Sequence, residues 1–459
     1  MSSLASHETN GSRFVSGRST LLIPFALGCA ILADRAQVGI ATGGRGTLPL
    51  LAIMAPAVAL ATVVRYGSGR SLGFLATPAF VLGVLPYLSL TALLPVLGVM
   101  FNGFPERTLL SLTEATTALS FLVIGAALSR GHGGSWSRWL FVAVTIQLLY
   151  ASGQAAYYSQ APGWELLTPF HEWDLSQQDP LTLVQGRSSG LYLNPNVLGF
   201  WAGLAVIVSW STMSPRYRWM GVSLGVLTLL LSQSRGAAAG VLAALVGGAV
   251  LSISGSGLSA RTFKGIASFA VAITAALAVA ALIVPAALLG DRFGALFDVW
   301  SEGPRAEPNL AARLDLWEAV IALNSVYPWG TWGSPEYVLG NAVDNAWFRL
   351  FAQGSVLFVA TLAMLLVAAF SVSRHTHGVA LPAVTIFIAV AGLTQTPFGY
   401  PAIVLFWLFL GGGLQASVVR VPSGLDEAGV AGIHMSRGHA APTRAARGPG
   451  SLRPGIPND

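Results

Sequence analysis

The stretch SVLFVATLAMLLVAAF, residues 355–370, decides the fold class, because it contains no charged residue, no proline and no glycine. It lies in the apolar run 347–371, which as a helix is long enough to cross the ~30 Å hydrocarbon core of a bilayer. Inside lipid every backbone N–H and C=O group needs a partner within the chain, so such a run must be helical. The stretch therefore predicts a membrane-spanning helix.

Eleven further apolar runs predict an all-α, polytopic transmembrane bundle of about 12 helices. The run 74–98 contains three prolines, which leaves open whether it is one span or two. The first run resembles a signal peptide in length, but no convincing small-residue cleavage site follows it, which favours a retained helix. The runs are 20–33, 47–64, 74–98, 108–128, 139–157, 196–212, 218–232, 236–253, 265–289, 378–396 and 401–418.

The composition supports a protein that folds in a membrane. Apolar residues make up 54% of the 459 residues and charged residues only 10%, against about 25% charged in a typical soluble domain. The net charge of +6 comes almost wholly from arginine, with Lys264 the only lysine, and these residues lie in short loops and the C-terminal tail. This placement is typical of topology-setting charges and argues against a nucleic-acid partner. Cys29 is the only cysteine, so no intramolecular disulfide can form.

Charge asymmetry predicts the orientation. With a cytoplasmic N-terminus and alternating spans, 16 of the 25 basic residues fall on the cytoplasmic side, and 14 of the 19 acidic residues fall outside. Basic residues are retained on the cytoplasmic side of membrane proteins. We therefore expect a multi-pass protein of the bacterial cytoplasmic (inner) membrane with both termini in the cytoplasm.

The same map predicts four regions. Residues 1–19 form a cytoplasmic tail, 20–157 the N-terminal transmembrane helices, 158–420 a second transmembrane part, and 421–459 a disordered cytoplasmic tail rich in Gly, Pro, Ala and Arg. The external segments 158–195 and 290–346 are too long for simple connections. The second contains several tryptophans and, over 310–321, apolar residues at helical spacing (Leu310, Leu314, Trp317 and Ile321), which predicts an ordered external cap with short helices.

Two polar patches border predicted helices on the external side. In the first, Arg187 precedes Asn194-Pro195-Asn196, which is typical of a helix start, with asparagine as the N-cap and proline next. In the second, Ser234 and Arg235 lie on a tight turn, followed by Gly236 and Gly240 at a spacing suited to close helix packing. A helix cap and an interfacial anchor explain these patches without any function. These structural roles do not explain Arg187, or why Arg235 lies on the external side, where positive charge is disfavoured.

Two more patches lie in and after the cap. Arg313 could simply pair with the nearby Asp315, and Asp344, beside Asn345, could simply cap the following helix. Glu114 is a fifth candidate, because an ionisable residue inside a span is a functional hypothesis by default. Its position about two turns from the external end also suits a hydrated structural role.

Together, three arginines (187, 235 and 313) and Asp344 are predicted on one side of the membrane. The guanidinium fork suits phosphate oxygens, and a carboxylate can accept the proton of an attacking hydroxyl. A diphosphate-linked substrate attacked by a hydroxyl would need both groups. No Asp/Glu/His cluster has metal-ligand spacing, so we expect no metal and no cofactor. No glycine-rich phosphate loop occurs on the cytoplasmic side, which argues against an ATP-driven pump.

At these patches the chain resembles the O-antigen ligase / O-antigen polymerase superfamily of bacterial envelope glycosyltransferases. The resemblance covers residues 185–370 and rests on five motifs in order: RSSGLYLNPNVLG (187–199), LSQSRGA (231–237), RLDLWEA (313–319), PWGTWG (328–333) and DNAWFRLFAQG (344–354). The ligase branch usually has a histidine before the asparagine of the last motif, where this chain has Asp344. That departure favours a polymerase-like or divergent member.

The resemblance implies a metal-independent, inverting transferase that moves a glycan from an undecaprenyl-diphosphate donor to a glycan or glycolipid acceptor outside the membrane. Arg187 and Arg235 would bind the diphosphate and Arg313 the glycan, while Asp344 would act on the acceptor hydroxyl. The motif residues expected to contact substrate are Asn194, Asn196, Ser234 and Asn345.

Two other functions stay open. A transporter or flippase of lipid-linked sugars predicts charges inside the span and repeated halves with paired broken helices, and the sequence shows no clear repeat. A non-catalytic scaffold for envelope assembly would tolerate the loss of Arg187, Arg235 and Asp344 together.

Overall fold

The computed structural model describes residues 21–32, 37–39, 47–66, 72–102, 108–128, 133–159, 162–163, 187–192, 194–256, 299, 301–333, 335–340, 343–373 and 380–419. The chain divides into two units, Met1–Val418 and Val419–Asp459. The described part is helical, apart from one pair of three-residue antiparallel strands, β1 (Gln37–Gly39) and β2 (Thr47–Pro49). The all-helical character predicted from the sequence is thus observed. The predicted tails 1–19 and 421–459 and the run 265–289 lie outside the described residues.

Helices occur at each of the other predicted runs. The N-terminal helices are α2 (Leu22–Leu32), α3 (Leu50–Tyr66), η1 (Gly73–Ala76), η2 (Phe80–Val84), α5 (Leu85–Leu97), η3 (Gly98–Asn102), α6 (Thr108–Leu128) and α7 (Gly133–Tyr158). The later helices are α10 (Pro195–Thr212), α11 (Pro215–Ser232), α12 (Arg235–Ser256), α15 (Pro308–Val326), α16 (Pro335–Leu339), α17 (Ala346–Ser373), α18 (Ala380–Ala391), η5 (Pro397–Gly399), η6 (Pro401–Ile403) and α19 (Val404–Val419).

Four helical segments are long and apolar enough to cross a membrane: Phe80–Asn102, Arg138–Tyr158, Ala346–Ser373 and Pro401–Val418. Six other apolar helices among the described residues are shorter. The predicted run 74–98 therefore corresponds to one candidate span, which has a π-helical turn at each end and a separate 3₁₀ turn before it.

The outer faces of these helices are apolar, which fits lipid contact. In α17, Phe358 and Leu365 are buried, whereas Val356, Leu357 and Val367 are 66%, 60% and 68% exposed. A helix that is hydrophobic all round is typical of a membrane span or of the core of a large protein. Because these side chains face outward, the helices have the character expected for membrane association.

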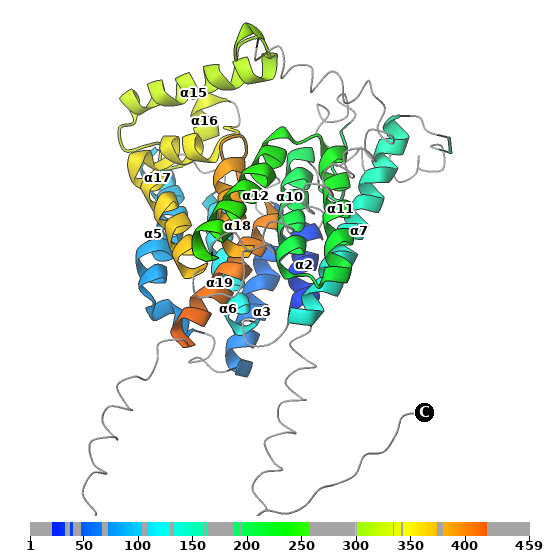
Figure 1. Cartoon of the computed structure of the whole chain (residues 1–459). Coiled ribbons are helices and arrows are strands. Elements are labelled where there is room, and N and C mark those ends of the chain that lie inside the picture. The colour runs from blue at the N-terminus through cyan, green and yellow to red at the C-terminus, as the bar shows by residue number, and fades with distance from the viewer. Residues whose placement is uncertain are drawn as a thin grey trace, which may run out of the picture. The chain divides into compact units, whose positions relative to one another are not determined.

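Helix α10 forms the centre of one half of the described unit, where it packs against α7, α11, α12 and α18 (Figure 1). Its residues from Pro195 to Ser209 are almost all buried. Helix α12 approaches α18 closely through the glycines predicted to allow such packing. A Cβ atom on Gly240 would lie 2.8 Å from Cδ2 of Phe387, and one on Gly236 would lie 1.8 Å from Oγ1 of Thr394. The predicted small-residue contact face is confirmed.

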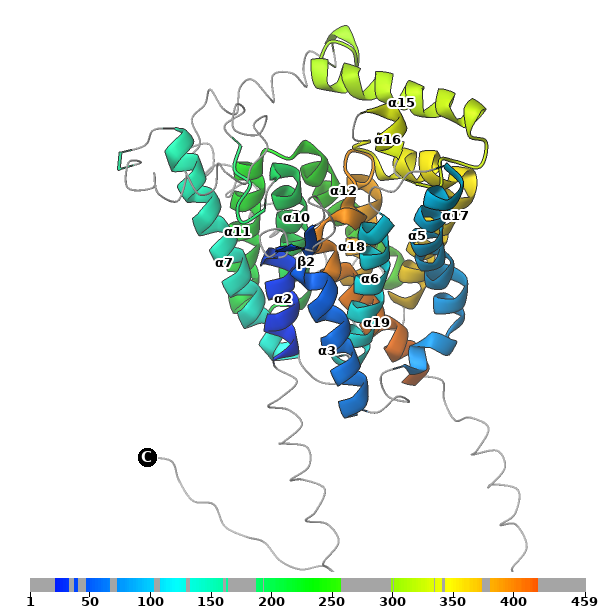
Figure 2. The same ribbon diagram turned by 180° about the vertical axis from the view of Figure 1, so that it is seen from behind.

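Helices α15 and α16 lie together at one end of the other helices (Figures 1 and 2). The predicted helix over 310–321 is confirmed within α15, and its predicted apolar face is buried only in part. Ile321 is 57% exposed, whereas its neighbour Val320 is fully buried against Val343 and Ala352. Trp317, which belongs to the predicted face, stacks on Phe348 of α17, with ring centroids 5.1 Å apart.

Helix α17 is broken at Gly354 and Ser355, which have non-helical backbone angles. The break exposes two carbonyl groups, and the loop between α15 and α16 binds them. The amides of Thr331 and Trp332 donate to the carbonyl oxygens of Ala352 and Gln353 over 2.8 and 2.9 Å. The break thus fixes the cap to a candidate membrane span.

Candidate functional site

Arg187 is held rigidly where two helix ends meet. Its Nε donates to the carbonyl oxygen of Ser232 at the end of α11 over 3.0 Å, and its Nη2 donates to Oδ1 of Asn196 in α10 over 2.8 Å. The residue is only 8% exposed. Asn194 caps α10, since its Oδ1 accepts the amide of Asn196 over 2.8 Å, as predicted. The guanidinium is therefore buried, oriented and bonded to protein oxygens.

Two glutamines of α7 hold the loop after Arg187, and sequence reasoning missed both. Oε1 of Gln154 accepts the amides of Ser189 and Gly190 over 2.9 and 2.8 Å, and Oε1 of Gln147 accepts the amide of Leu191 over 3.0 Å. The two glutamines are buried and lie two helical turns apart on one face. The signal that the sequence offered was a pair of glutamine side chains two helical turns apart within an apolar run.

The turn between α11 and α12 is as tight as predicted. Gln233 takes the left-handed conformation, with φ of 51°, and Ser234 follows it directly before α12. Ser234 is buried, and its Oγ accepts a hydrogen bond from Nε2 of Gln395 over 2.8 Å. A Cβ atom on Gly199 would lie 2.2 Å from Cβ of Ser234. The turn therefore packs on α10 without a gap.

Arg235 is paired with the cap. Its Nη2 lies 3.1 Å from Oε1 of Glu307, whose Oε2 accepts the amide of Leu310 and so caps α15. The side chain of Arg235 is 29% exposed and that of Glu307 only 6%. Sequence reasoning missed Glu307, although its position directly before Pro308 is typical of an N-cap. Arg235 thus connects the start of α12 to the start of α15.

Arg313 and Asp344 form an ion pair, with Nη2 and Oδ2 3.5 Å apart. The predicted alternative, a local pair of Arg313 with Asp315, is wrong, because Asp315 pairs with Arg305. Although the side chain of Asp344 is 52% exposed, partial desolvation raises the pKa of its carboxyl group, and the positive charge of Arg313 acts in the opposite direction. The candidate base and the candidate glycan ligand therefore face each other.

Asn345, not Asp344, caps α17. Its Oδ1 accepts the amides of Trp347 and Phe348 over 2.9 and 3.1 Å, and its Nδ2 donates to the carbonyl oxygen of Leu393 over 2.7 Å. The predicted capping role of Asp344 is therefore wrong. The carboxylate of Asp344 is turned toward the cap, where it meets Arg313.

Three of the four sequence patches meet around the turn 392–396, which follows α18. The side chain of Gln395 donates a hydrogen bond to Ser234, and the carbonyl oxygen of Leu393 accepts one from the side chain of Asn345. The backbone amide of Ala346 donates to the carbonyl oxygens of Gly392 and Gln395 over 2.8 and 3.0 Å. Arg187 joins the same group through Ser232, two residues before Ser234. Arg235 reaches away from this turn to Glu307, and Arg313 of the fourth patch pairs with Asp344. The patches thus share one end of the helices, while the side chains of Arg187 and Arg235 have different partners.

Tyr400 is a further residue of this region that sequence reasoning missed. It follows η5, and its ring lies 5.6 Å from that of Phe200 in α10. Burial raises the pKa of its hydroxyl group, and the negative charge of Asp344 contributes in the same direction. Both effects disfavour loss of the hydroxyl proton.

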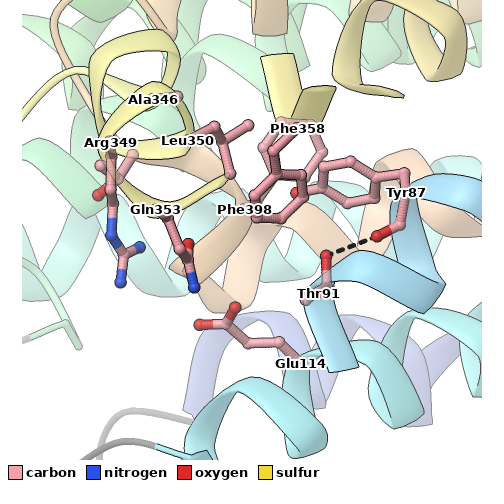
Figure 3. Close-up of a pocket in the computed structure, with 11 residues that line it drawn as sticks. Tyr87, Thr91, Glu114, Ala346, Arg349, Leu350, Gln353, Phe358 and Phe398 are labelled. Atoms are coloured by element: carbon pink, nitrogen blue, oxygen red, sulfur yellow. Dashed lines mark hydrogen bonds between the residues drawn. The ribbon is translucent and has the colours of Figure 1, made fainter. Parts of the chain in front are cut away.

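A pocket opens beside this region, and none of the eight predicted site residues lines it (Figure 3). Three of its residues carry polar side chains from α6 and α17, namely Glu114, Arg349 and Gln353. The others are Tyr87, Thr91, Ala346, Leu350, Phe358, Thr396, Phe398 and Gly399. Glu114, which the sequence offered as a fifth candidate, is therefore a pocket residue.

The described residues contain no group of three or more His, Cys, Asp or Glu side chains that could hold a metal ion. The metal-independent chemistry predicted from the sequence stays a prediction. No known protein family matches the chain, and no curated protein matches it. Fold and site together define an all-helical protein with helices able to cross a membrane and a polar, arginine-containing region under a helical cap.

Proposed function

We propose that this protein is a membrane glycosyltransferase that moves a glycan from an undecaprenyl-diphosphate carrier to an acceptor sugar on the external face, in the manner of an O-antigen ligase or polymerase. The observation that carries the proposal is the meeting of the 187–196 segment, the 232–235 turn and the 344–346 segment around residues 392–396. These segments are far apart in the sequence and carry three of the five motifs on which the family resemblance rests.

The diphosphate would bind beside the α11–α12 turn. Arg187 is preorganised there by Ser232 and Asn196, and a fixed cation stabilises developing phosphate charge without having to reorganise. Arg235 is more exposed and is paired with Glu307, so the anionic substrate would compete with that carboxylate. Asn194, Asn196 and Ser234 would shape the same site.

The glycan and the acceptor would bind toward the cap, where Arg313, Asp344 and Asn345 lie. In the transfer, the acceptor hydroxyl oxygen forms a bond to the anomeric carbon while the bond from that carbon to the phosphate oxygen breaks. The diphosphate leaves with the electron pair, and Asp344 takes the hydroxyl proton. A carboxyl group with a raised pKa is a stronger base than an ordinary aspartate.

The direct test replaces Arg235 by Ala and by Lys in a host that lacks its own copy of the protein. We expect the Ala variant to lose most surface glycan length or amount. Arg305→Ala is the control, because Arg305 is a 62% exposed cap arginine paired with Asp315 and Glu318. Glycan unchanged in the Arg235→Ala variant would reject the assignment.

A transporter of lipid-linked sugars is the second candidate, favoured by two observations. Helix α17 is broken within a candidate span, and Glu114 and Arg349 place charges in or beside candidate spans. Broken helices and intramembrane charges are typical of transporters. Purified protein that transfers glycan from the lipid diphosphate in detergent, without any gradient, would decide for the enzyme.

A further inference from the structure

The pocket of Figure 3 carries charged groups of both signs. Arg349 lies one turn into α17, and its Nε is 3.0 Å from Oε1 of Glu336 in the cap helix α16. Glu114, from α6, also interacts electrostatically with Arg349. Both members of the Arg349–Glu336 pair are largely buried, with side chains 22% and 13% exposed. Three separate elements thus bring charged side chains to one place.

The charges restrict what the pocket can bind. A free anion would be repelled by Glu114 and Glu336, and a free cation would have to compete with Arg349, which already pairs with Glu336. The Gln353 side chain offers both a donor and an acceptor, as does any hydroxyl group that enters. A neutral group that donates and accepts hydrogen bonds satisfies all of these side chains, and a hydroxyl group is the simplest example.

The size agrees with this chemistry. The cavity measures about 30 Å³, room for one or two water molecules. Figure 3 shows the polar ends of Arg349, Gln353 and Glu114 on one side and the rings of Phe358, Phe398 and Tyr87 on the other. The rings give the cavity an apolar wall and the polar side chains a hydrogen-bonding wall, which suits a single hydroxyl or hydroxymethyl group.

We propose that this pocket binds a hydroxyl or hydroxymethyl group of a pyranose sugar, with Glu114 accepting the hydrogen bond of that hydroxyl. That this sugar belongs to the acceptor glycan rests on the proposed function. The position fits, because Thr396 of the pocket follows Gln395, the partner of Ser234, and Ala346 lies two residues after Asp344. A sugar anchored here would place its remaining hydroxyl groups toward the turn 392–396.

The binding test uses purified full-length protein in detergent and saturation-transfer NMR with methyl glucoside, methyl mannoside and N-acetylglucosamine as probes. We expect at least one probe to bind, Glu114→Ala to weaken its affinity about tenfold or more, as loss of a charge-assisted hydrogen bond does, and Glu114→Gln to weaken it less. Glu318→Gln is the control, because this cap residue lies outside the pocket and is 70% exposed.

Two results would overturn the proposal: none of the probes binds, or the Glu114 variants bind as tightly as the wild type. If Glu114→Ala does not fold, Glu114→Gln decides alone, provided that its melting temperature is that of the wild type. The proposed function is tested separately by glycan transfer. Sugar binding without transfer would reject the transferase and keep the pocket, whereas transfer with an unchanged acceptor KM in Glu114→Gln would reject the pocket and keep the transferase.

Discussion

Nε2 of Gln395 donates a hydrogen bond to Oγ of Ser234 over 2.8 Å, between residues 161 positions apart. Both side chains are buried. The bond joins the turn after α18 to the turn before α12, and so joins the segment around Asn345 to the segment around Arg187. Within the packing of α12 on α18, this bond is therefore one of the polar contacts that hold the proposed site together.

We therefore expect Ser234→Ala to destabilise the protein and to disturb the site. The substitution leaves a buried amide donor without its partner, which costs roughly 1–3 kcal/mol. Thermal unfolding in detergent measures the loss. Ser325→Ala is the control, because the exposed Ser325 only bonds the carbonyl oxygen of Ala322 within α15. Equal melting temperatures of the two variants would show that the Gln395–Ser234 bond contributes nothing.

Close packing of α10 against the α11–α12 turn gives a second prediction. A methyl group at Gly199 would meet Cβ of Ser234 at 2.2 Å and Oγ of Ser232 at 2.8 Å. Gly199→Ala should therefore cost about 1–3 kcal/mol and shift Ser232, which binds Arg187. Gly153→Ala in α7 is the matched control, because nothing lies within 4 Å of the added atom and alanine favours helix by about 0.5–1 kcal/mol. We expect the melting temperature of Gly153→Ala to be higher than that of Gly199→Ala, and thermal unfolding in detergent measures both.

Much of the fold could be predicted from the sequence, because long apolar runs have few alternatives to helix. The helix start at Asn194 and the tight turn before Arg235 were also predictable, since local capping and glycine spacing decide them. The break in α17 was not predictable. It occurs at Gly354–Ser355 inside an apolar run and depends on the loop containing Thr331, which is distant in sequence.

The candidate site was predicted only as a set of patches. Their meeting point, the turn 392–396, contains no charged residue and gave no sequence signal. The partners of Arg235 and Arg313 depend on how the cap folds back, which hydropathy does not determine. Glu114 was recognised as unusual, but Arg349, with which it interacts, was not identified as a candidate from the sequence.

The docking of the cap into the break of α17 gives a third prediction, at Gly330. This glycine has a φ of +84°, and a Cβ atom there would lie 2.5 Å from the carbonyl oxygen of Gln353. Gly330→Ala should therefore combine a backbone cost of roughly 1–2 kcal/mol with a clash that displaces the loop. Hydrogen exchange of the Thr331 and Trp332 amides, which bond the break, should become faster.

Gly303→Ala separates the two causes, because Gly303 has a φ of +97° and nothing within 4 Å of the added atom. It carries the backbone cost without the clash. Equal exchange of the Thr331 amide in both variants would show that the cap does not depend on this contact.

Because the pKa of Asp344 is raised, we expect stability and transfer activity to change in opposite directions with pH. The folded protein binds the carboxyl proton more readily than the unfolded chain, so the free energy of unfolding contributed by this group falls as pH rises from the ordinary aspartate value through the raised one. In Asp344→Asn this part of the pH dependence should disappear. Melting temperature measured against pH in the acidic range checks the stability prediction.

Transfer activity should change in the opposite direction, because Asp344 can accept a proton only when it is ionised. Activity should therefore rise with pH through the same range. Arg313→Ala removes the cation that lowers the pKa of Asp344, so the midpoint of the activity profile should move to higher pH. Arg313→Lys should restore most of the shift, since it restores the charge. A profile that stays in place in Arg313→Ala would mean that another group, and not Asp344, sets the pH dependence of transfer.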